Sequence, residues 1–340
     1  MSVRSKSLSA SATLAIAVAA ITWAGSASAA DMPVKEKKAP PPPPEAPFFF
    51  VNQNSLSYSY AFTANNPGAG KTPKDILSFT HFDVWAYGTN FFNVDWLKAT
   101  NGKAPPNGAP AAPCDFIAPD PNACSGYTEI YGLFRSTFGW NQIFNTKAFA
   151  VGPMTNIEFV VGSDLNTDNT TLESAKRSIQ GGLQFDFATP YKGFINISAS
   201  VYKEWQNDGF AARNADGSGL NLSGKVDFDA TWAIEALYSQ PLAFQPLPLT
   251  FKSFAVIHGP KGCGEPCNPG PGLKRTTEFL TQQTLLLDVG KLAWGKPDQF
   301  AVWTAYRWWK NKFGIDPNQP GFSFSNTIES TWLTGATWTF

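Results

Sequence analysis

The sequence is poor in histidine, in charged residues and in long apolar runs. Only two of its 340 residues are histidine and 15% are charged, whereas soluble domains average about 25% charged. Two histidines are too few for a multi-histidine metal centre, so we predict no metal and no cofactor. No apolar run of 18 or more residues follows the N-terminal segment, and we therefore expect no transmembrane helix.

The charges that are present balance almost completely. Lys and Arg total 26 and Asp and Glu total 26; without the first 30 residues, 24 basic and 26 acidic side chains remain. A nucleic-acid-binding chain would show a basic excess, so nucleic acid is excluded as a partner. Aromatic residues reach 14%. A chain rich in aromatics, poor in charge and free of hydrophobic blocks suits a β-protein with alternating apolar residues.

The N-terminus has the features of a secretory signal peptide. Arg4 and Lys6 precede a short apolar stretch, and small residues end at Ala30. Residues 31–47 are polar and Pro-rich, with Pro40–Pro44 favouring an extended leader. We therefore predict a signal peptide over 1–30, a periplasmic leader over 31–47 and a folded domain over 48–340.

Alternation of polar and apolar residues, the signature of strands, continues along the rest of the chain. In 225–239, for example, polar Asp227 and Glu235 alternate with apolar Trp232 and Tyr238. The sequence predicts twelve strands: 51–62, 75–87, 90–98, 127–138, 154–164, 177–188, 193–206, 224–240, 247–258, 276–289, 298–312 and 325–340.

These strands favour a membrane barrel over a soluble sandwich. Most are long enough to cross a bilayer when tilted. Aromatics gather near the strand ends, and the chain ends on Phe340, as in outer-membrane barrels. With both termini in the periplasm, the outer connections have 12 to 28 residues and the inner ones 2 to 8, apart from 15 at 139–153. That exception suggests that the fourth strand extends beyond 138.

We therefore predict an all-β fold, a transmembrane antiparallel β-barrel of about 12 strands. The signal peptide and the barrel together predict the outer membrane of a Gram-negative bacterium as its location. Lipid and lipopolysaccharide would then be its surroundings, and we expect a monomer.

The four cysteines fall in two of the expected outer loops. Three pairings are possible, and the local pairing of Cys114 with Cys124 and of Cys263 with Cys267 is preferred for an exported protein. The spacing does not match a zinc site.

An enzyme is not expected. His81 and His258 are the two candidate bases, but neither has a serine and an acid placed beside it on one strand face. No G-x-S-x-G motif occurs. A barrel hydrolase using His81 remains an alternative.

Charged residues at inward positions predict a hydrated lumen rather than an apolar core. Counting the register from Phe340 places His81 inward along with the candidates for the solute path, which are Asp83, Glu129, Tyr131, Arg135, Glu158, Asp186, Tyr202, Glu204, Asp229, Glu235, Trp303 and Arg307. Either these groups line a solute path or they pair across strands and fill the lumen. Trp303 would offer a flat solute a stacking face.

Several stretches resemble the Tsx-like nucleoside-specific channels. They are Thr128-Glu129-Ile130, Arg135-Ser136, Val151-Gly152-Pro153, His81-Phe82-Asp83, Asp95-Trp96 and 201–207. The resemblance runs in order from about 52 to 340. It implies a monomeric twelve-stranded channel that passes nucleosides. The Pro-rich leader, the cysteine-containing loops and the long loop at 99–126 depart from that pattern.

The sequence thus predicts a substrate-selective diffusion channel for small polar solutes, with nucleosides suspected. The alternatives are a non-selective small porin and a blocked structural barrel whose outer loops bind partners.

Overall fold

A computed structural model describes residues 48–67, 70–100, 128–168, 175–207, 225–262, 275–318 and 326–340. The predicted signal peptide, the leader and all four cysteines lie outside these residues. The strands are β1 (Phe49–Ala61), β2 (Asn65–Asn66), β3 (Gly70–Lys71), β4 (Lys74–Trp85), β5 (Gly88–Ala99), β6 (Thr128–Gly139), β7 (Met154–Asp168), β8 (Arg177–Thr189), β9 (Gly193–Asn207), β10 (Lys225–Asp227), β11 (Thr231–Pro241), β12 (Leu249–His258), β13 (Glu278–Asp288), β14 (Phe300–Lys310) and β15 (Glu329–Thr339).

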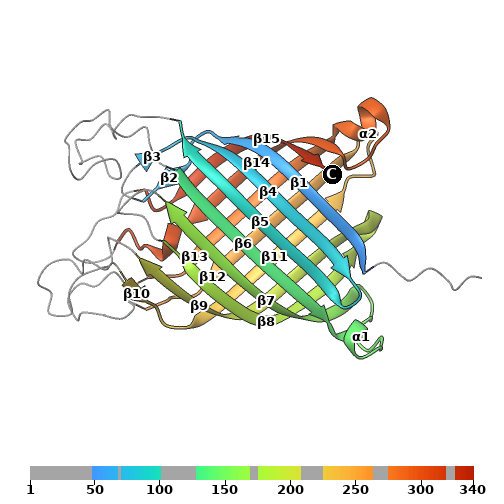
Figure 1. The fold of residues 1–340 in the computed structure, drawn as a ribbon, viewed down its shortest axis with the longest axis horizontal. Helices are drawn as coiled ribbons and strands as arrows, with labels where there is room; N and C mark the ends of the chain where they lie inside the picture. Colours follow the sequence, from blue (N-terminus) through green and yellow to red (C-terminus); the bar gives the residue numbers. More distant parts are fainter. Residues whose placement is uncertain are drawn as a thin grey trace, which may run out of the picture. The chain divides into compact units, whose positions relative to one another are not determined.

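Twelve long strands form one closed antiparallel sheet (Figure 1). Each pairs with its neighbour in sequence, except that the short β10 adds only to one end of β9. The seam closes where β1 pairs with β15, from Ser55 opposite Thr339 to Ala61 opposite Leu333. Asn54 and Phe340 extend this seam through two backbone hydrogen bonds. Closure removes the free sheet edges that would otherwise be exposed.

The predicted strands are confirmed with small shifts in their ends. One prediction is wrong: 224–240 is not a single strand, because residues 228–230 leave the sheet between β10 and β11. The fourth strand extends beyond 138 by only one residue, to Gly139, so the connection that follows it stays long and begins with the short helix α1 (Trp140–Ile143).

The two ends of the barrel differ. Most of the longer connections between long strands leave from one end, called here the loop end. The opposite turn end carries α1, η1 (Pro190–Lys192), α2 (Val289–Trp294) and the chain's last residue. A short helical turn, η2 (Lys312–Gly314), lies at the loop end after β14.

The outer wall is apolar and aromatic. Val201, Ile197 and Trp232 are examples of large outward side chains that are exposed, and Val201 is 66% exposed. Side chains on the other face of the same strands are buried, as Tyr202 next to Val201 illustrates. An apolar outer belt on a closed antiparallel barrel is the architecture of an outer-membrane protein, which confirms the predicted fold and location.

Within the described ranges, no helix has both the length and the apolar character needed to cross a membrane.

Candidate functional site: the lumen

Strand alternation assigns each predicted site residue to a face of the barrel. Inward positions share the face of buried side chains such as Leu333 and Tyr202, whereas outward positions share the face of exposed ones. Ten of the twelve candidates lie on the inward face: Glu129, Tyr131, Arg135, Glu158, Asp186, Tyr202, Glu204, Glu235, Trp303 and Arg307.

Asp83 lies on the outer face, which corrects its placement in the lumen. It is two residues from His81, which is opposite Phe92 on β5, and Phe92 is 39% exposed. His81 therefore faces outward as well. The sequence is ambiguous here because β4 carries Phe79 on one face and Phe82 on the other, and a one-residue slip in register exchanges the faces.

Asp229 is also misplaced by the sequence reading. It is exposed and lies in the segment between β10 and β11, where its N–H donates to the backbone oxygen of Lys261. The chain leaves the sheet here because Phe228 turns inward and is fully buried. The Lys261 ammonium and the Arg275 guanidinium lie 5.5 and 5.6 Å from the centre of its ring.

Arg135 bridges the lumen. Its Nε and Nη2 donate to the two carboxylate oxygens of Glu235 at 2.9 and 2.6 Å. Arg135 is on β6 and Glu235 is on β11, with β7, β8 and β9 between them, so the pair spans the interior. Nη1 also donates to Asp164 at 2.9 Å. Glycine at position 162 makes room, since a Cβ there would lie 2.6 Å from Cδ of Arg135.

A second buried network surrounds Glu204. The hydroxyl of Tyr202 and the ammonium of Lys261 both donate to Oε2 of Glu204, at 2.6 and 2.8 Å. Gln206 donates to Oε1. Glu204 and Lys261 are each 1% exposed at the side chain, so the pair is desolvated and depends on mutual charge compensation.

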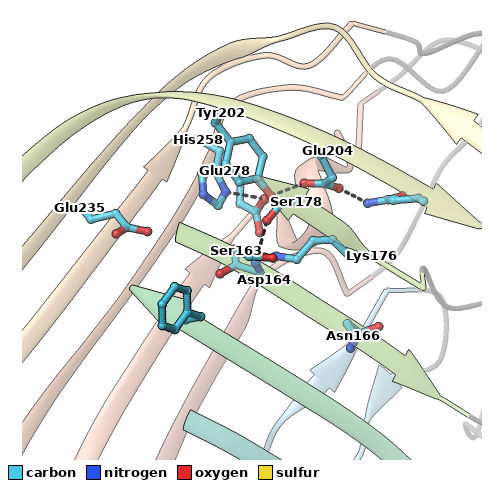
Figure 2. Close-up of polar contacts among 12 residues, drawn as sticks. Ser163, Asp164, Asn166, Lys176, Ser178, Tyr202, Glu204, Glu235, His258 and Glu278 are labelled. Atoms are coloured by element: carbon cyan, nitrogen blue, oxygen red, sulfur yellow. Dashed lines mark hydrogen bonds and ion pairs between the residues drawn. The ribbon is translucent and has the colours of Figure 1, made fainter. Parts of the chain in front are cut away.

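His258 joins this network through its ring (Figure 2). The rings of Tyr202 and His258 stack with centroids 4.2 Å apart. Nδ1 of His258 lies 3.4 Å from Glu278, whose other oxygen accepts from Trp309 at 2.8 Å. Nε2 of His258 is buried and has no hydrogen-bond partner among the described residues.

Lys176 lies between β7 and β8 at the loop end, close to Asp164 (3.5 Å) and to the ring of Tyr131. Burial alone would lower the pKa of Lys176, but the nearby Tyr202 and Asp164 outweigh it and the pKa is raised well above its ordinary value. Lys176 therefore remains charged.

The remaining inward charges near the loop end pair in the same way. Lys74 binds Glu129 at 3.2 Å, and Lys312 binds Glu329 at 2.8 Å. Arg307 donates through Nε to Gln282 at 2.9 Å. We call the whole set the charged belt: Lys74, Glu129, Arg135, Asp164, Lys176, Glu204, Glu235, Lys261, Glu278, Arg307, Lys312 and Glu329.

The lumen nearer the turn end is different. Leu237 lies on the same face as Glu235, yet 49% of it is exposed. Lys252 also faces inward and is exposed. Solvent thus enters this half of the barrel. Its wall carries Asp186 and Glu158, which both accept from Nε2 of Gln184, at 2.8 and 3.3 Å.

Trp303 faces the lumen, and the edge of its indole ring is held in place by neighbouring residues. Its Nε1 donates to Thr337 at 3.0 Å, and its ring lies over Gly335, where a Cβ would lie 2.5 Å from Cζ2. Together with Tyr131, it packs against an inward apolar cluster of Ala61, Ala64, Ile76, Leu97, Ala305 and Leu333.

The sequence list omitted Asp164, Lys176, His258 and Lys261. Asp164 follows Glu158 by an even number of residues on β7, so alternation alone would have found it. Lys176 and Lys261 lie outside the strands, where alternation carries no information. Within the described part of the chain, no three metal-binding side chains converge on a common point.

No protein-family model matches the chain, and no curated protein matches its sequence. Solved structures with some similarity include the β-domain of the Bordetella autotransporter BrkA, at 10% identity and a TM-score of 0.32 over 85% of this chain and 98% of that one. OprD of Pseudomonas aeruginosa is 10% identical with a TM-score of 0.28, over 85% and 94%. OmpT, an outer membrane protein of Vibrio cholerae, is 8% identical with a TM-score of 0.33, over 85% and 97%. The strand pairing of this chain, and not these weak similarities, establishes its fold.

Proposed function

We propose that the chain forms an outer-membrane channel through which small polar solutes diffuse passively. The observation that carries the proposal is the exposed, inward-facing Leu237: the interior admits solvent instead of being packed throughout. Between that open half and the loop end lies the charged belt. A solute would have to pass this belt, so it is the natural place for selection.

Passage past the belt requires exchange of hydrogen bonds. The Arg135–Glu235 pair presents donors and acceptors to the interior, and each is partly accessible at the side chain. Such groups can hold a polar solute briefly in place of water. Binding must stay weak, because a solute has to leave the site as readily as it enters. Passage of a solute through the channel therefore needs no cofactor and involves no covalent step.

Nucleosides are the solutes we favour. The resemblance to Tsx-like channels supports this choice, as does an aromatic ring at Trp303 that faces the lumen. Tyr202 does not add to it, because its ring is fully buried and already stacks on His258. Among the predicted aromatic positions, Trp303 is thus the best candidate for base stacking.

Solute uptake into liposomes that contain the mature protein tests both the channel and its preference for nucleosides. Uptake of uridine and thymidine is compared with that of sugars of similar mass. Faster, saturable nucleoside uptake is expected. Equal uptake ordered only by size would leave a channel but remove nucleoside selectivity.

A blocked barrel is the second candidate, and one observation favours it. The Arg135–Glu235 bridge crosses the lumen, while Tyr131 and Trp303 pack on the inward apolar cluster. If folded protein passes no solute, this reading replaces the channel. The outer loops would then be the functional surface, as partner-binding segments.

Charge reversal at Asp186 is expected to shift ion selectivity. Asp186 and Glu158 form an acidic pair on the open half of the wall, and both are held by the neutral Gln184. An acidic wall attracts cations. Asp186→Lys should therefore lower the cation preference, measured as the reversal potential in a planar bilayer under a salt gradient.

The matched control is Asp75→Lys. Asp75 lies on the outer face, next to exposed Leu77, and accepts from Tyr58 at 2.6 Å. This change should leave the reversal potential where it was. An unchanged potential in folded Asp186→Lys would remove this wall from the ion path.

A further inference from the structure

Five polar residues on the outer face of β1, β4, β5 and β6 form a continuous chain of hydrogen bonds. The residues are Asn54, His81, Asp83, Asn90 and Ser136, called here the outer polar strip. The two ring nitrogens of His81 lie 2.9 Å from Oδ1 of Asn54 and 3.1 Å from Oδ2 of Asp83. Asn90 donates to Asp83 at 2.9 Å, and Ser136 donates to Asn90 at 2.7 Å.

Register places the whole strip on the outside of the barrel. Asn54 is opposite His81, and Asn90 is opposite both Asp83 and Ser136. All five therefore share the face of Phe79, Phe92 and Phe134, which are exposed. None of them reaches the lumen, so the proposed channel makes no use of them.

The strip lies between two rows of outward aromatic rings. Phe79 is on its loop-end side. Trp85 is on its turn-end side, where it contacts the rings of Phe48 and Phe138 at 6.0 Å. Phe79 and Trp85 are six residues apart on β4, which is about 20 Å along a strand. The strip therefore interrupts the apolar zone instead of lying beyond it.

Hydrocarbon offers no hydrogen bonds to such groups. The polar groups of the strip form many of their hydrogen bonds with one another, and Asp83 is buried by its neighbours. Its β1 edge is different. Asn52, which is opposite Asp83, is exposed. The side chain of Asn54 bonds to His81 through Oδ1, and its side-chain nitrogen has no hydrogen-bond partner among the described residues. His81 keeps 30% of its side chain exposed.

A partner for this edge must present polar groups at the same depth in the bilayer. A second copy of the chain does so automatically, because the membrane holds both barrels at one level. The strip carries donors and acceptors together, so it is self-complementary, as a two-fold contact requires. Lipid headgroups lie at the membrane surface, beyond the row of rings around Trp85.

We propose that the outer polar strip is the surface through which two copies of the chain associate side by side in the membrane. Polar side chains then hydrogen-bond across the contact, as they do between membrane helices. The exposed Phe79, Phe92 and Phe134 extend the contact on its loop-end side. This assigns a dimer where the sequence resemblance implied a monomer.

The test compares the full-length protein with Asn52→Trp in lipid nanodiscs and in detergent, with mass measured by sedimentation velocity. Asn52 is exposed at the edge of the strip, so tryptophan there blocks a close approach without disturbing the barrel. We expect a two-chain species for the unchanged protein and its loss in Asn52→Trp. Val201→Trp is the control, since Val201 is equally outward on β9, across the barrel from the strip.

A second variant guards against a purely steric result. Asn54→Leu removes an amide without adding bulk, and it should also weaken association. A single-chain species at every concentration of unchanged protein would overturn the proposal, as would a two-chain species that neither variant affects. Phospholipid that co-purifies with single chains and is lost in Asn52→Trp would assign the strip to lipid and overturn it as well.

Discussion

Replacing Arg135 with alanine is expected to raise single-channel conductance severalfold. The Arg135–Glu235 pair spans the lumen, with two hydrogen bonds of 2.6 and 2.9 Å, and divides its cross-section. Alanine removes the guanidinium and most of the side-chain volume from the lumen at this level. It also leaves Glu235 unpaired, so the conductance gained should be mainly cationic. Planar-bilayer recording of the purified variant measures both effects.

Two further variants make the result interpretable. Arg135→Lys keeps the charge but loses the two-point contact with Glu235, so its conductance should fall between those of the unchanged protein and Arg135→Ala. Arg177→Ala removes an exposed arginine on the outer face of β8 and should have no effect. If folded Arg135→Ala conducts like the unchanged protein, the bridge does not limit flow.

Replacing Lys261 with methionine is expected to cause the largest loss of stability. Lys261 and Glu204 are each 1% exposed and lie 2.8 Å apart. Methionine preserves the bulk of Lys261 but leaves the buried Glu204 carboxylate without its positively charged partner. Breaking a buried pair from one side typically costs about 3–5 kcal/mol. Urea unfolding of the barrel in lipid vesicles, followed by tryptophan fluorescence, gives the change in free energy of unfolding.

A double variant separates the lost charge partner from simple packing. Glu204→Gln added to Lys261→Met removes the stranded charge, so it should recover much of the lost stability. The surface control is Lys203→Met, which breaks the more exposed Lys203–Asp227 pair and should cost far less stability than Lys261→Met. A loss in Lys261→Met as small as that in Lys203→Met would mean that the pair contributes little.

Alternation along the strands was sufficient to predict the barrel and most of its inward face. Each strand alternates because one face meets lipid and the other meets the lumen, so the sequence carries the signal directly. Arg135, Glu204 and Trp303 were placed inward on this basis alone. The twelve-strand count followed from the same pattern, since every long run of alternation supplied one long strand of the closed sheet, although the run at 224–240 is interrupted at residues 228–230.

The pattern failed where both faces of a strand look alike. β4 carries phenylalanine on both faces near its turn end, so the outward position of His81 and Asp83 could not be read from it. It also failed at residues 228–230, where burial of Phe228 beneath Lys261 and Arg275 takes the chain out of the sheet. That contact joins residues distant in sequence, and alternation reports only local geometry.

The ion pairs within the charged belt could not be predicted from the sequence either. Arg135 and Glu235 are 100 residues apart, and Glu204 and Lys261 are 57 apart. Several residues lie outside any strand, as Lys176 and Lys261 do. Knowing that a charge points inward does not say which of several opposite charges it meets, because this depends on the depth and slant of each strand.

The seam between β1 and β15 has a consequence for how the chain folds. The hydroxyls of Ser57 and Thr337 share a hydrogen bond across 280 residues of sequence. Until this seam forms, β1 and β15 both present unpaired backbone groups, which in hydrocarbon are costly and in water are templates for aggregation. Contacts of such long range form slowly. Pairing of β15 with β1 is therefore the step that closes the barrel. A chaperone that covers both free strand edges until they pair would suppress misassembly.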